Sequence, residues 1–182
     1  PGVLKSPDKD MYFAARELGF IRDNFTGGHD AFLKGRITIP IGDRFGRVVA
    51  FSGRALGADS PKYLGTPNSA IYEKKMSLFG WHVALPEIRK TGVMVVVEGY
   101  FDAYAAWEHG IKNVVACSGT ALTEEQLHNS RPLKKVVLAM DADGAGQEAV
   151  RKSILLCRAL GIAVEVSKLE KYKDFGEALQ QG

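Results

Sequence analysis

The chain has 182 residues, 46% hydrophobic and 25% charged, a balance that excludes both a disordered polar chain and a membrane-embedded one. The formal net charge is only +3, but residues 1–90 carry 14 Lys and Arg against 9 Asp and Glu, whereas residues 91–182 carry 10 against 12. A basic first half beside an acidic second half suits a polyanionic substrate, although a solvated basic face would give the same counts.

The first residue of the chain and its cysteines indicate the origin of the chain and its redox environment. The chain begins with Pro1 rather than Met and shows no signal peptide, so we expect an excised fragment. Cys117 and Cys157 lie in apolar contexts and are expected to be buried free thiols in a reducing cytoplasm rather than a disulfide. The four histidines have no ligand spacing.

The first half reads as a small mixed α+β lobe over residues 1–90. In chain order we expect a helix over Lys9–Leu18 ended by Gly19, a turn or loop over Asn24–Asp30, strands over Gly35–Ile41 and Gly46–Arg54 forming a hairpin, a turn-rich segment over Ala58–Lys75, and a mostly helical bridge over Leu78–Lys90. Cations gather on this lobe: Arg36, Arg44, Arg47, Arg54, Lys62, Lys74 and Lys75.

The second half, residues 91–182, alternates strands and helices. The expected strands are Val93–Glu98, Asn113–Cys117, Lys135–Met140 and Ile162–Val166, and the expected helices are Phe101–His109, one headed by Thr123 with Gln126 at capping-box spacing, Gly146–Leu160 and Phe175–Gln181. Strands that alternate with helices predict an α/β fold whose parallel sheet is flanked by helices.

Two of these strands end in acids. Glu98 follows Val93–Val97, and Asp141 and Asp143 follow Lys135–Met140. Open α/β sheets bind ligands at the carboxyl ends of their strands, where carboxylates that converge need a cation between them. Oxygen ligands favour Mg²⁺ or Mn²⁺, so we expect Glu98, Asp141 and Asp143 to hold one or two such ions for phosphoryl chemistry.

Two more acids accompany this set. Asp102, one helical turn after Glu98, either supports the site or caps the following helix, and Asp174 after the last strand is a candidate to complete the cluster. Other interpretations of Asp141–Gly146 fit less well. An EF-hand loop counted from Asp141 would have Lys152 at its twelfth position, and a haloacid-dehalogenase-type phosphatase would have Thr in place of Ala145.

The motifs VEGYFD, VVACSGTALTEEQ and LAMDADGAG resemble the Toprim domain of primases, topoisomerases and some nucleases. Ahead of them, IPIGDRFGRVVAFSGR and PKYLGTPNSAIYEKKMSLFG resemble the basic lobe of bacterial DnaG-type primases. The resemblance runs from about Arg16 to the end of the chain, and it implies a Toprim domain over residues 91–182 preceded by part of the amino-terminal lobe of a primase catalytic core.

The resemblance implies template-directed synthesis of short RNA primers on single-stranded DNA from NTPs, at a replication fork in the nucleoid, with Mg²⁺ or Mn²⁺. It also implies roles for individual residues. Glu98, Asp141 and Asp143 would be catalytic and bind metal, and Asp102 and Asp174 would join the acidic cluster. The residues expected to contact nucleotide or DNA are Arg47, Arg54, Lys62, Tyr63 and Lys74. A zinc-binding domain and a helicase would be partners through regions outside this chain, and no membrane partner is expected.

The chain departs from the family pattern at three places. Gly176 stands where the family has the second Asp of DPDE, which leaves Glu177 as a candidate replacement, and Gly65 stands where Asn is common. Ala142 stands where Asp-Gly-Asp is the commoner pattern, a change expected to be harmless. Two other functions therefore stay open: a Toprim nuclease or topoisomerase fragment, and a Toprim module that binds nucleic acid without catalysis. Measurement of metal binding at Glu98 and Asp141 would distinguish the non-catalytic Toprim module, which need not bind metal there, from the enzymes.

Overall fold

The computed structural model describes most of the chain, and its described part divides into two compact units. The described residues are 8–24, 26–57, 61–140, 144–167 and 175–181. Unit 1 comprises Pro1–Ile41 and Val48–Lys74, and unit 2 comprises Gly42–Arg47 and Lys75–Gly182. This division follows compactness; the predicted boundary between a basic lobe and a Toprim domain at residue 90 stays a prediction.

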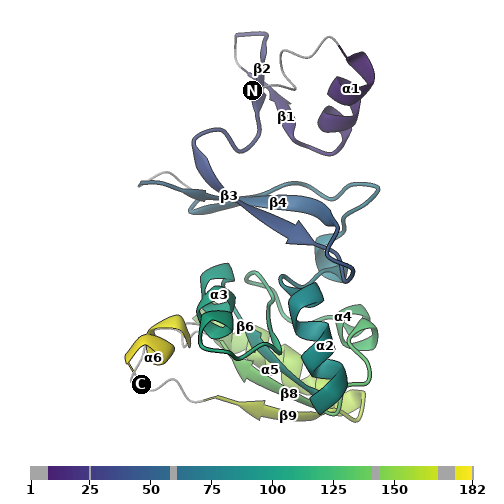
Figure 1. The fold of residues 1–182 in the computed structure, drawn as a ribbon, viewed down its shortest axis with the longest axis vertical. Coiled ribbons are helices and arrows are strands. Elements are labelled where there is room, and N and C mark those ends of the chain that lie inside the picture. The colour runs from purple at the N-terminus through teal and green to yellow at the C-terminus, as the bar shows by residue number, and fades with distance from the viewer. Residues whose placement is uncertain (1–7, 25, 58–60, 141–143, 168–174, 182) are drawn as a thin grey trace. The chain divides into compact units, whose positions relative to one another are not determined.

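Unit 1 is built from short strands and one helix (Figure 1). In chain order its elements are α1 (Lys9–Glu17), β1 (Ile21–Asp23), β2 (His29–Ala31), β3 (Arg36–Gly42), β4 (Val48–Ala55), β5 (Tyr63–Gly65) and the 3₁₀ turn η2 (Lys74–Met76), the ends of β3 and η2 extending into unit 2. β1 and β2 form an antiparallel pair, and β3, β4 and β5 form a sheet in that order. The predicted helix and the predicted strand pair β3–β4 are confirmed within two residues at each end.

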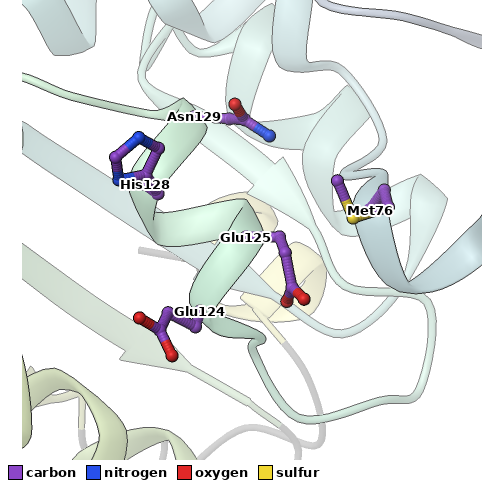
Figure 2. Close-up of a pocket in the computed structure, with 5 residues that line it drawn as sticks. All are labelled: Met76, Glu124, Glu125, His128 and Asn129. Atoms are coloured by element: carbon purple, nitrogen blue, oxygen red, sulfur yellow. The ribbon is translucent and has the colours of Figure 1, made fainter.

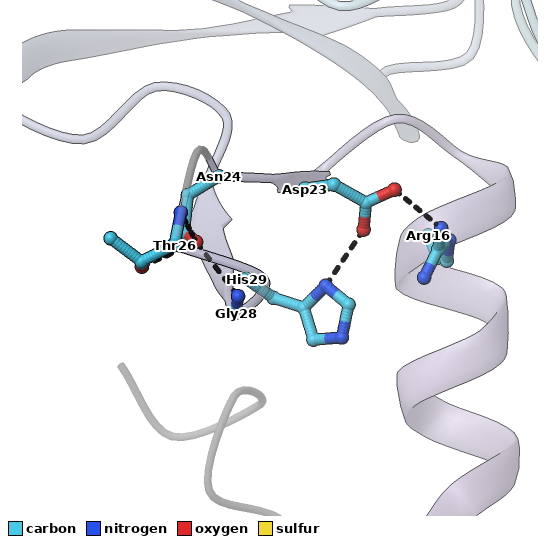
Figure 3. Close-up of polar contacts among 6 residues, drawn as sticks. All are labelled: Arg16, Asp23, Asn24, Thr26, Gly28 and His29. Carbon is cyan, nitrogen blue, oxygen red and sulfur yellow. Dashed lines mark hydrogen bonds and ion pairs between the residues drawn. The ribbon is translucent and has the colours of Figure 1, made fainter.

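The predicted turn over Asn24–Asp30 covers the connection of the hairpin β1–β2, which we did not predict, but its last two residues, His29 and Asp30, belong to β2. Figure 3 shows that Asn24 Oδ1 accepts hydrogen bonds from the backbone N–H of Gly28 at 2.8 Å and from the Thr26 hydroxyl at 2.9 Å. Asp23 accepts from Arg16 Nη2 at 2.8 Å and lies 2.8 Å from His29 Nδ1. The contact to Gly28 is part-buried and the other three are exposed, so the hairpin is shaped by local polar bonds that each stabilise it only slightly.

Unit 2 contains the parallel sheet that the alternating pattern predicts, and the predicted α/β fold is confirmed (Figure 1). Its strands are β6 (Val93–Val97), β7 (Val114–Ala116), β8 (Lys135–Ala139) and β9 (Ala163–Val166), in the order β7-β6-β8-β9. Its helices are α2 (Trp81–Thr91), α3 (Tyr100–Glu108), α4 (Glu124–Asn129), α5 (Gly144–Ala159) and α6 (Phe175–Gln181). No helix in the described ranges is long and apolar enough to cross a bilayer.

The core of unit 2 lies between this sheet and its helices. Ile88 of α2, Leu127 of α4 and Cys157 of α5 share one cluster with the alternate β6 residues Met94 and Val96, all of them at most 1% exposed. The β-branched runs supply this burial because central parallel strands are covered on both faces. The cluster fixes the sheet, and with it the edge at which the acids were expected.

Two helix starts are set by specific residues. Thr123 and Gln126 form the predicted capping box, in which the N–H of Gln126 donates to Thr123 Oγ1 at 3.2 Å and the N–H of Thr123 donates to Gln126 Oε1 at 3.0 Å. The helix predicted from Leu78 begins instead at Trp81, because Gly80 takes a left-handed conformation with φ 78° and ends the preceding segment.

Candidate functional site

The carboxyl ends of β6, β7 and β8 meet at one edge of the unit 2 sheet. Val97 pairs with Ala116 on one side and with Ala139 on the other, all three strands running in the same direction. The next residues, Glu98, Cys117 and Met140, therefore follow neighbouring strand ends. β6 and β8 are direct neighbours in the sheet, and Asp141 comes two positions after Ala139 in the sequence.

Glu98 is held at this edge through its backbone. Its carbonyl accepts a hydrogen bond from Ser118 N–H at 3.0 Å, which ties it to the segment that follows β7. The Oε2 oxygen of its carboxylate is buried. A carboxylate oxygen is the type of atom that a hard divalent ion takes as a ligand.

Ser118 is a feature of the edge that the sequence did not reveal. It has φ 55°, a left-handed conformation that residues other than glycine rarely adopt, and Gly119 follows with φ 77°. Such strain is concentrated at functional sites, where the surrounding structure holds it. Here the strained turn places the Ser118 N–H against Glu98, so it fixes the main chain beside the proposed metal ligand.

Asp102 makes two backbone contacts from the first turn of α3. Its Oδ2 accepts from Gly99 N–H and its Oδ1 accepts from Gly176 N–H, both at 3.0 Å. The helix cap that its spacing predicted is thus present, and the contact with α6 is an addition that spacing alone could not show. Whether Asp102 also binds metal stays a prediction.

The other predicted ligands cannot be placed from the structure. Asp141, Asp143 and Asp174 lie outside the described residues. Among the residues that are described, no group of three or more His, Cys, Asp or Glu side chains is arranged to hold a metal ion. The proposed ligand set therefore rests on Glu98, on the strand register and on the sequence.

The two cysteines are buried free thiols, as predicted. Cys117 lies at the same edge as Glu98, its Sγ 3.8 Å from Met140 Sδ, and burial raises the pKa of its thiol to about 11. Burial also raises the pKa of Cys157 to about 11. Since the thiolate is the reacting form, neither sulfur is suited to act as a nucleophile near neutral pH.

We expect iodoacetamide at pH 8 to alkylate the folded chain about 100-fold more slowly than the chain in guanidinium chloride, because a rise of two pKa units removes that share of the thiolate. Mass spectrometry of the labelled protein over time measures both rates at Cys117 and Cys157. Equal rates in the folded and unfolded chain would contradict the burial of the thiols.

Three of the predicted nucleic-acid-binding residues lie together in unit 1. Arg54 and Tyr63 are direct partners across β4 and β5, and Arg54 Nη1 donates to the Tyr63 hydroxyl at 3.3 Å. Lys62 Nζ lies 5.9 Å and Arg54 Cζ 5.8 Å from the centroid of the Tyr63 ring. Two cations beside one aromatic ring can contact phosphates and a base together, which suits a nucleotide or a single strand.

The remaining predicted cations have other surroundings. Arg47 lies in the turn between β3 and β4, where its Nη2 is 2.7 Å from Asp43 Oδ2 and its guanidinium lies 5.4 Å from the Phe45 ring. Hydrogen bonds from Arg47 and from Phe45 N–H lower the pKa of Asp43 against the opposing effect of desolvation. Lys74 begins η2, and its N–H donates to Asn68 Oδ1.

Arg36, the first residue of β3, is a structural brace. Arg36 Nη1 donates to the carbonyls of Gly53 at 3.3 Å and Pro61 at 2.7 Å, and so it joins β3 to the chain around β5. Its guanidinium satisfies backbone acceptors, which separates it from the Arg54, Lys62 and Tyr63 cluster.

A shallow pocket of about 360 Å³ beside α4 was not anticipated from the sequence. Figure 2 shows its five lining residues: Met76, Glu124, Glu125, His128 and Asn129. Hydrogen bonds from the backbone N–H of Glu125 and from Thr123 lower the pKa of Glu125, with a further contribution from Lys75. The carboxylates of Glu124 and Glu125 among the lining residues make this pocket unfavourable for a polyphosphate, so the sheet edge remains the candidate site.

Two protein families match successive segments of the chain. A family described as "DNA primase catalytic core, N-terminal domain" matches residues 6–85, and a family described as "Toprim-like" matches residues 95–179. The two matches follow one another along the chain and leave only residues 1–5, 86–94 and 180–182 outside them.

Curated relatives give the same result. A DNA primase of Halalkalibacterium halodurans is 39% identical over 98% of this chain and 30% of the relative, and one of Aquifex aeolicus is 43% identical over 74% of this chain and 27% of the relative. The chain thus spans about a third or less of the length of these relatives.

Solved structures agree in fold. The zinc-binding and RNA polymerase domains of the Aquifex aeolicus primase match with a TM-score of 0.87 and 36% identity, over 98% of this chain and 44% of the solved one. A DnaG primase catalytic domain bound to single-stranded DNA matches with a TM-score of 0.87 and 29% identity, over 100% of this chain and 61% of the solved one. The chain therefore belongs to the DnaG-type DNA primase family and corresponds to part of its catalytic core.

Proposed function

We propose that this chain carries the nucleotidyl-transfer site of a DNA primase, which joins NTPs into short RNA primers on a single-stranded DNA template. In this reaction a 3′-hydroxyl attacks the α-phosphate of an incoming NTP, a P–O bond forms, and pyrophosphate leaves. The observation that carries the proposal is the parallel register of β6 and β8, which brings Glu98 to the strand end from which the chain continues to Asp141 and Asp143.

Glu98, Asp141 and Asp143 are the proposed ligands of Mg²⁺ or Mn²⁺, with Asp174 as a further member of the acidic set. The buried Oε2 of Glu98 fits such an ion, since a carboxylate oxygen withdrawn from water gains most from a nearby positive charge. When bound, one or two ions would lower the pKa of the attacking hydroxyl and stabilise charge on the leaving oxygen. The chain's own part is to hold these carboxylates in place on a buried sheet.

The Arg54, Lys62 and Tyr63 cluster is the proposed contact for nucleotide phosphates or template. Its guanidinium and ammonium can pair with phosphates while the ring offers a stacking surface for a base. Lys74 and Arg47 are proposed as further contacts. For Arg47 the ion pair with Asp43 offsets part of its charge, so we expect its contribution to be smaller.

The proposed partners are single-stranded DNA, NTPs and the growing RNA primer. A helicase and a zinc-binding domain would act through parts of the relatives that lie outside this chain, and the setting would be the replication fork in the cytoplasm. On this proposal residues 91–182 act as the Toprim domain and residues 1–90 as part of the basic lobe.

The test of the proposed function is primer synthesis on single-stranded DNA with NTPs and Mn²⁺. We expect dinucleotides and short RNA whose formation requires both NTPs and the ion, and EDTA should abolish it. A Toprim nuclease would instead cut the DNA in the absence of NTPs. DNA cleavage with no RNA product would reject the primase proposal and favour the nuclease.

We expect Arg54→Ala to weaken binding of single-stranded DNA about 3- to 10-fold and to lower the slope of log affinity against log salt by about 0.7, since one phosphate contact is lost. Fluorescence anisotropy of a labelled oligonucleotide at several salt concentrations measures both quantities. Arg16→Ala is the matched control, because Arg16 is an exposed arginine of the same unit paired with Asp23. Equal losses in the two variants would show that the effect is general charge and not the cluster.

A further inference from the structure

Asp102 links two helices that are far apart in the chain. Its Oδ1 accepts the N–H of Gly176, 74 positions away, at the second residue of α6. Its Oδ2 accepts the N–H of Gly99, the residue that precedes α3. Figure 1 shows α6, the last helix that the structure describes, beside α3. One carboxylate therefore joins the beginnings of both helices.

This arrangement requires glycine at position 99, because a Cβ there would collide with the Asp102 carboxylate. The φ of −103° at Gly99 is open to any residue, but a Cβ at this position would lie 2.7 Å from Asp102 Oδ2, which is closer than real Cβ atoms approach. Asp102 is the third residue of α3, and its side chain makes one of the two hydrogen bonds of a capping box, the one to the backbone of the N-cap residue Gly99. The second bond, from a side chain of the N-cap residue, cannot form because Gly99 has no side chain. The side chain absent at Gly99 is what lets the carboxylate reach the backbone.

The contact acts on Glu98 through the peptide group that joins it to Gly99. On one side, the Glu98 carbonyl accepts from Ser118 N–H at 3.0 Å. On the other side, the N–H of the same peptide group donates to Asp102 Oδ2 at 3.0 Å. Both polar atoms of this peptide are thus fixed, and the direction in which the Glu98 side chain leaves the backbone is fixed with them.

We propose that Asp102 is a positioning residue, which orients Glu98 through the Glu98–Gly99 peptide and holds the first turn of α6 against α3. Its consequence for metal binding rests on the proposed function of Glu98 as a ligand. The clamp itself does not, because both of its hydrogen bonds are made within the protein. A carboxylate that accepts two backbone N–H groups forms charge-assisted bonds, which are stronger than neutral ones.

Asp102→Asn tests this role with little change of shape. The amide keeps one acceptor oxygen and replaces the other with an NH₂ group, which cannot accept from an N–H donor. One of the two backbone groups, at Gly99 or Gly176, therefore loses its partner. Glu108→Gln is the matched control, since it neutralises an exposed carboxylate at the other end of the same helix.

Two measurements are made on the parent and both variants. Hydrogen exchange of α6 amides, followed by mass spectrometry in EDTA, should be about 10-fold faster in Asp102→Asn and unchanged in Glu108→Gln. The Kd for Mn²⁺, measured from the free-ion signal in electron paramagnetic resonance, should rise about 10-fold in Asp102→Asn alone. Peptides from β6 and β8 should exchange as in the parent, which shows that the sheet is intact.

The two readouts separate positioning from other roles. A ligand role would weaken Mn²⁺ binding while α6 exchange in EDTA stays as in the parent, and a purely structural role would speed α6 exchange with no change in the Kd for Mn²⁺. Either pattern overturns the proposal. If the parent itself bound no Mn²⁺, the metal site would be rejected and the positioning role with it, whereas α6 exchange would still report whether the clamp exists.

Discussion

Asp141→Asn is expected to lower dinucleotide synthesis at least about 100-fold while the chain stays folded. The reason is the loss of one of the three carboxylates proposed to hold the ions on which nucleotidyl transfer depends, and a single group that stabilises charge at such a site contributes about 100- to 1,000-fold. The substitution keeps size and one oxygen, so the change falls on charge. The measurement is the rate of RNA formation on single-stranded DNA with NTPs and Mn²⁺.

Three controls separate loss of chemistry from loss of structure. Glu148→Gln neutralises an exposed carboxylate of the same unit, where Glu148 pairs with Arg151 and Lys152, and should leave synthesis unchanged. Circular dichroism and single-stranded DNA binding of Asp141→Asn should match those of the parent, and its affinity for Mn²⁺ should fall. Synthesis at the parent rate by Asp141→Asn would refute the proposed metal site.

The regular elements of unit 2 could be predicted because each has a strong local signal. The strand Val93–Val97 is a run of β-branched residues and methionine, and the helix after Thr123 has its capping partner three residues away. Elements with weak local signals were missed. β1, β2 and β5 have three residues each, too few for an alternating pattern to be visible.

Contacts between distant segments could not be predicted from spacing. The turn between β3 and β4 groups with unit 2, where a Cβ on Gly42 would lie 3.3 Å from His82 Nδ1, and nothing in the local sequence indicates that neighbour. The Asp102 contact with Gly176 is of the same kind. The helix cap at Asp102 was predictable because its partner is three residues away, whereas the second partner depends on how α6 packs.

In the candidate site, too, features with a local sequence signal could be predicted, whereas contacts between distant segments could not. Glu98 was predictable from the end of a hydrophobic run, and the parallel direction of the strands follows from the β-α alternation, but the strand order that sets β6 beside β8 was not predicted. The resemblance implied Arg54, Lys62 and Tyr63 only as a set of residues. Their grouping in space follows from the pairing of β4 with β5. The strain at Ser118 has no sequence signal, since serine rarely adopts a positive φ.

Gly80→Ala is expected to destabilise unit 2 by about 4 kcal/mol, because it combines backbone strain with a clash in a closed aromatic cluster. Gly80 has φ 78°, and a Cβ there would clash with Trp107 Cζ2 and lie 2.5 Å from Cη2. The indole cannot move aside easily, since it stacks on Phe79 with centroids 5.7 Å apart and its Nε1 donates to the Val114 carbonyl at 3.1 Å.

Gly110→Ala isolates the strain from the clash. Gly110 has φ 82° and nothing within 4 Å of an added Cβ, so its substitution should cost only about 1 kcal/mol. Urea unfolding followed by tryptophan fluorescence compares the two variants, and it reports on unit 2 because Trp81 and Trp107, the two tryptophans of the chain, both lie there. Similar losses in both variants would mean that the aromatic cluster relaxes around a methyl group. A loss several-fold larger at Gly80 would show instead that the start of α2 packs against Trp107 of α3 so closely that only hydrogen fits at position 80.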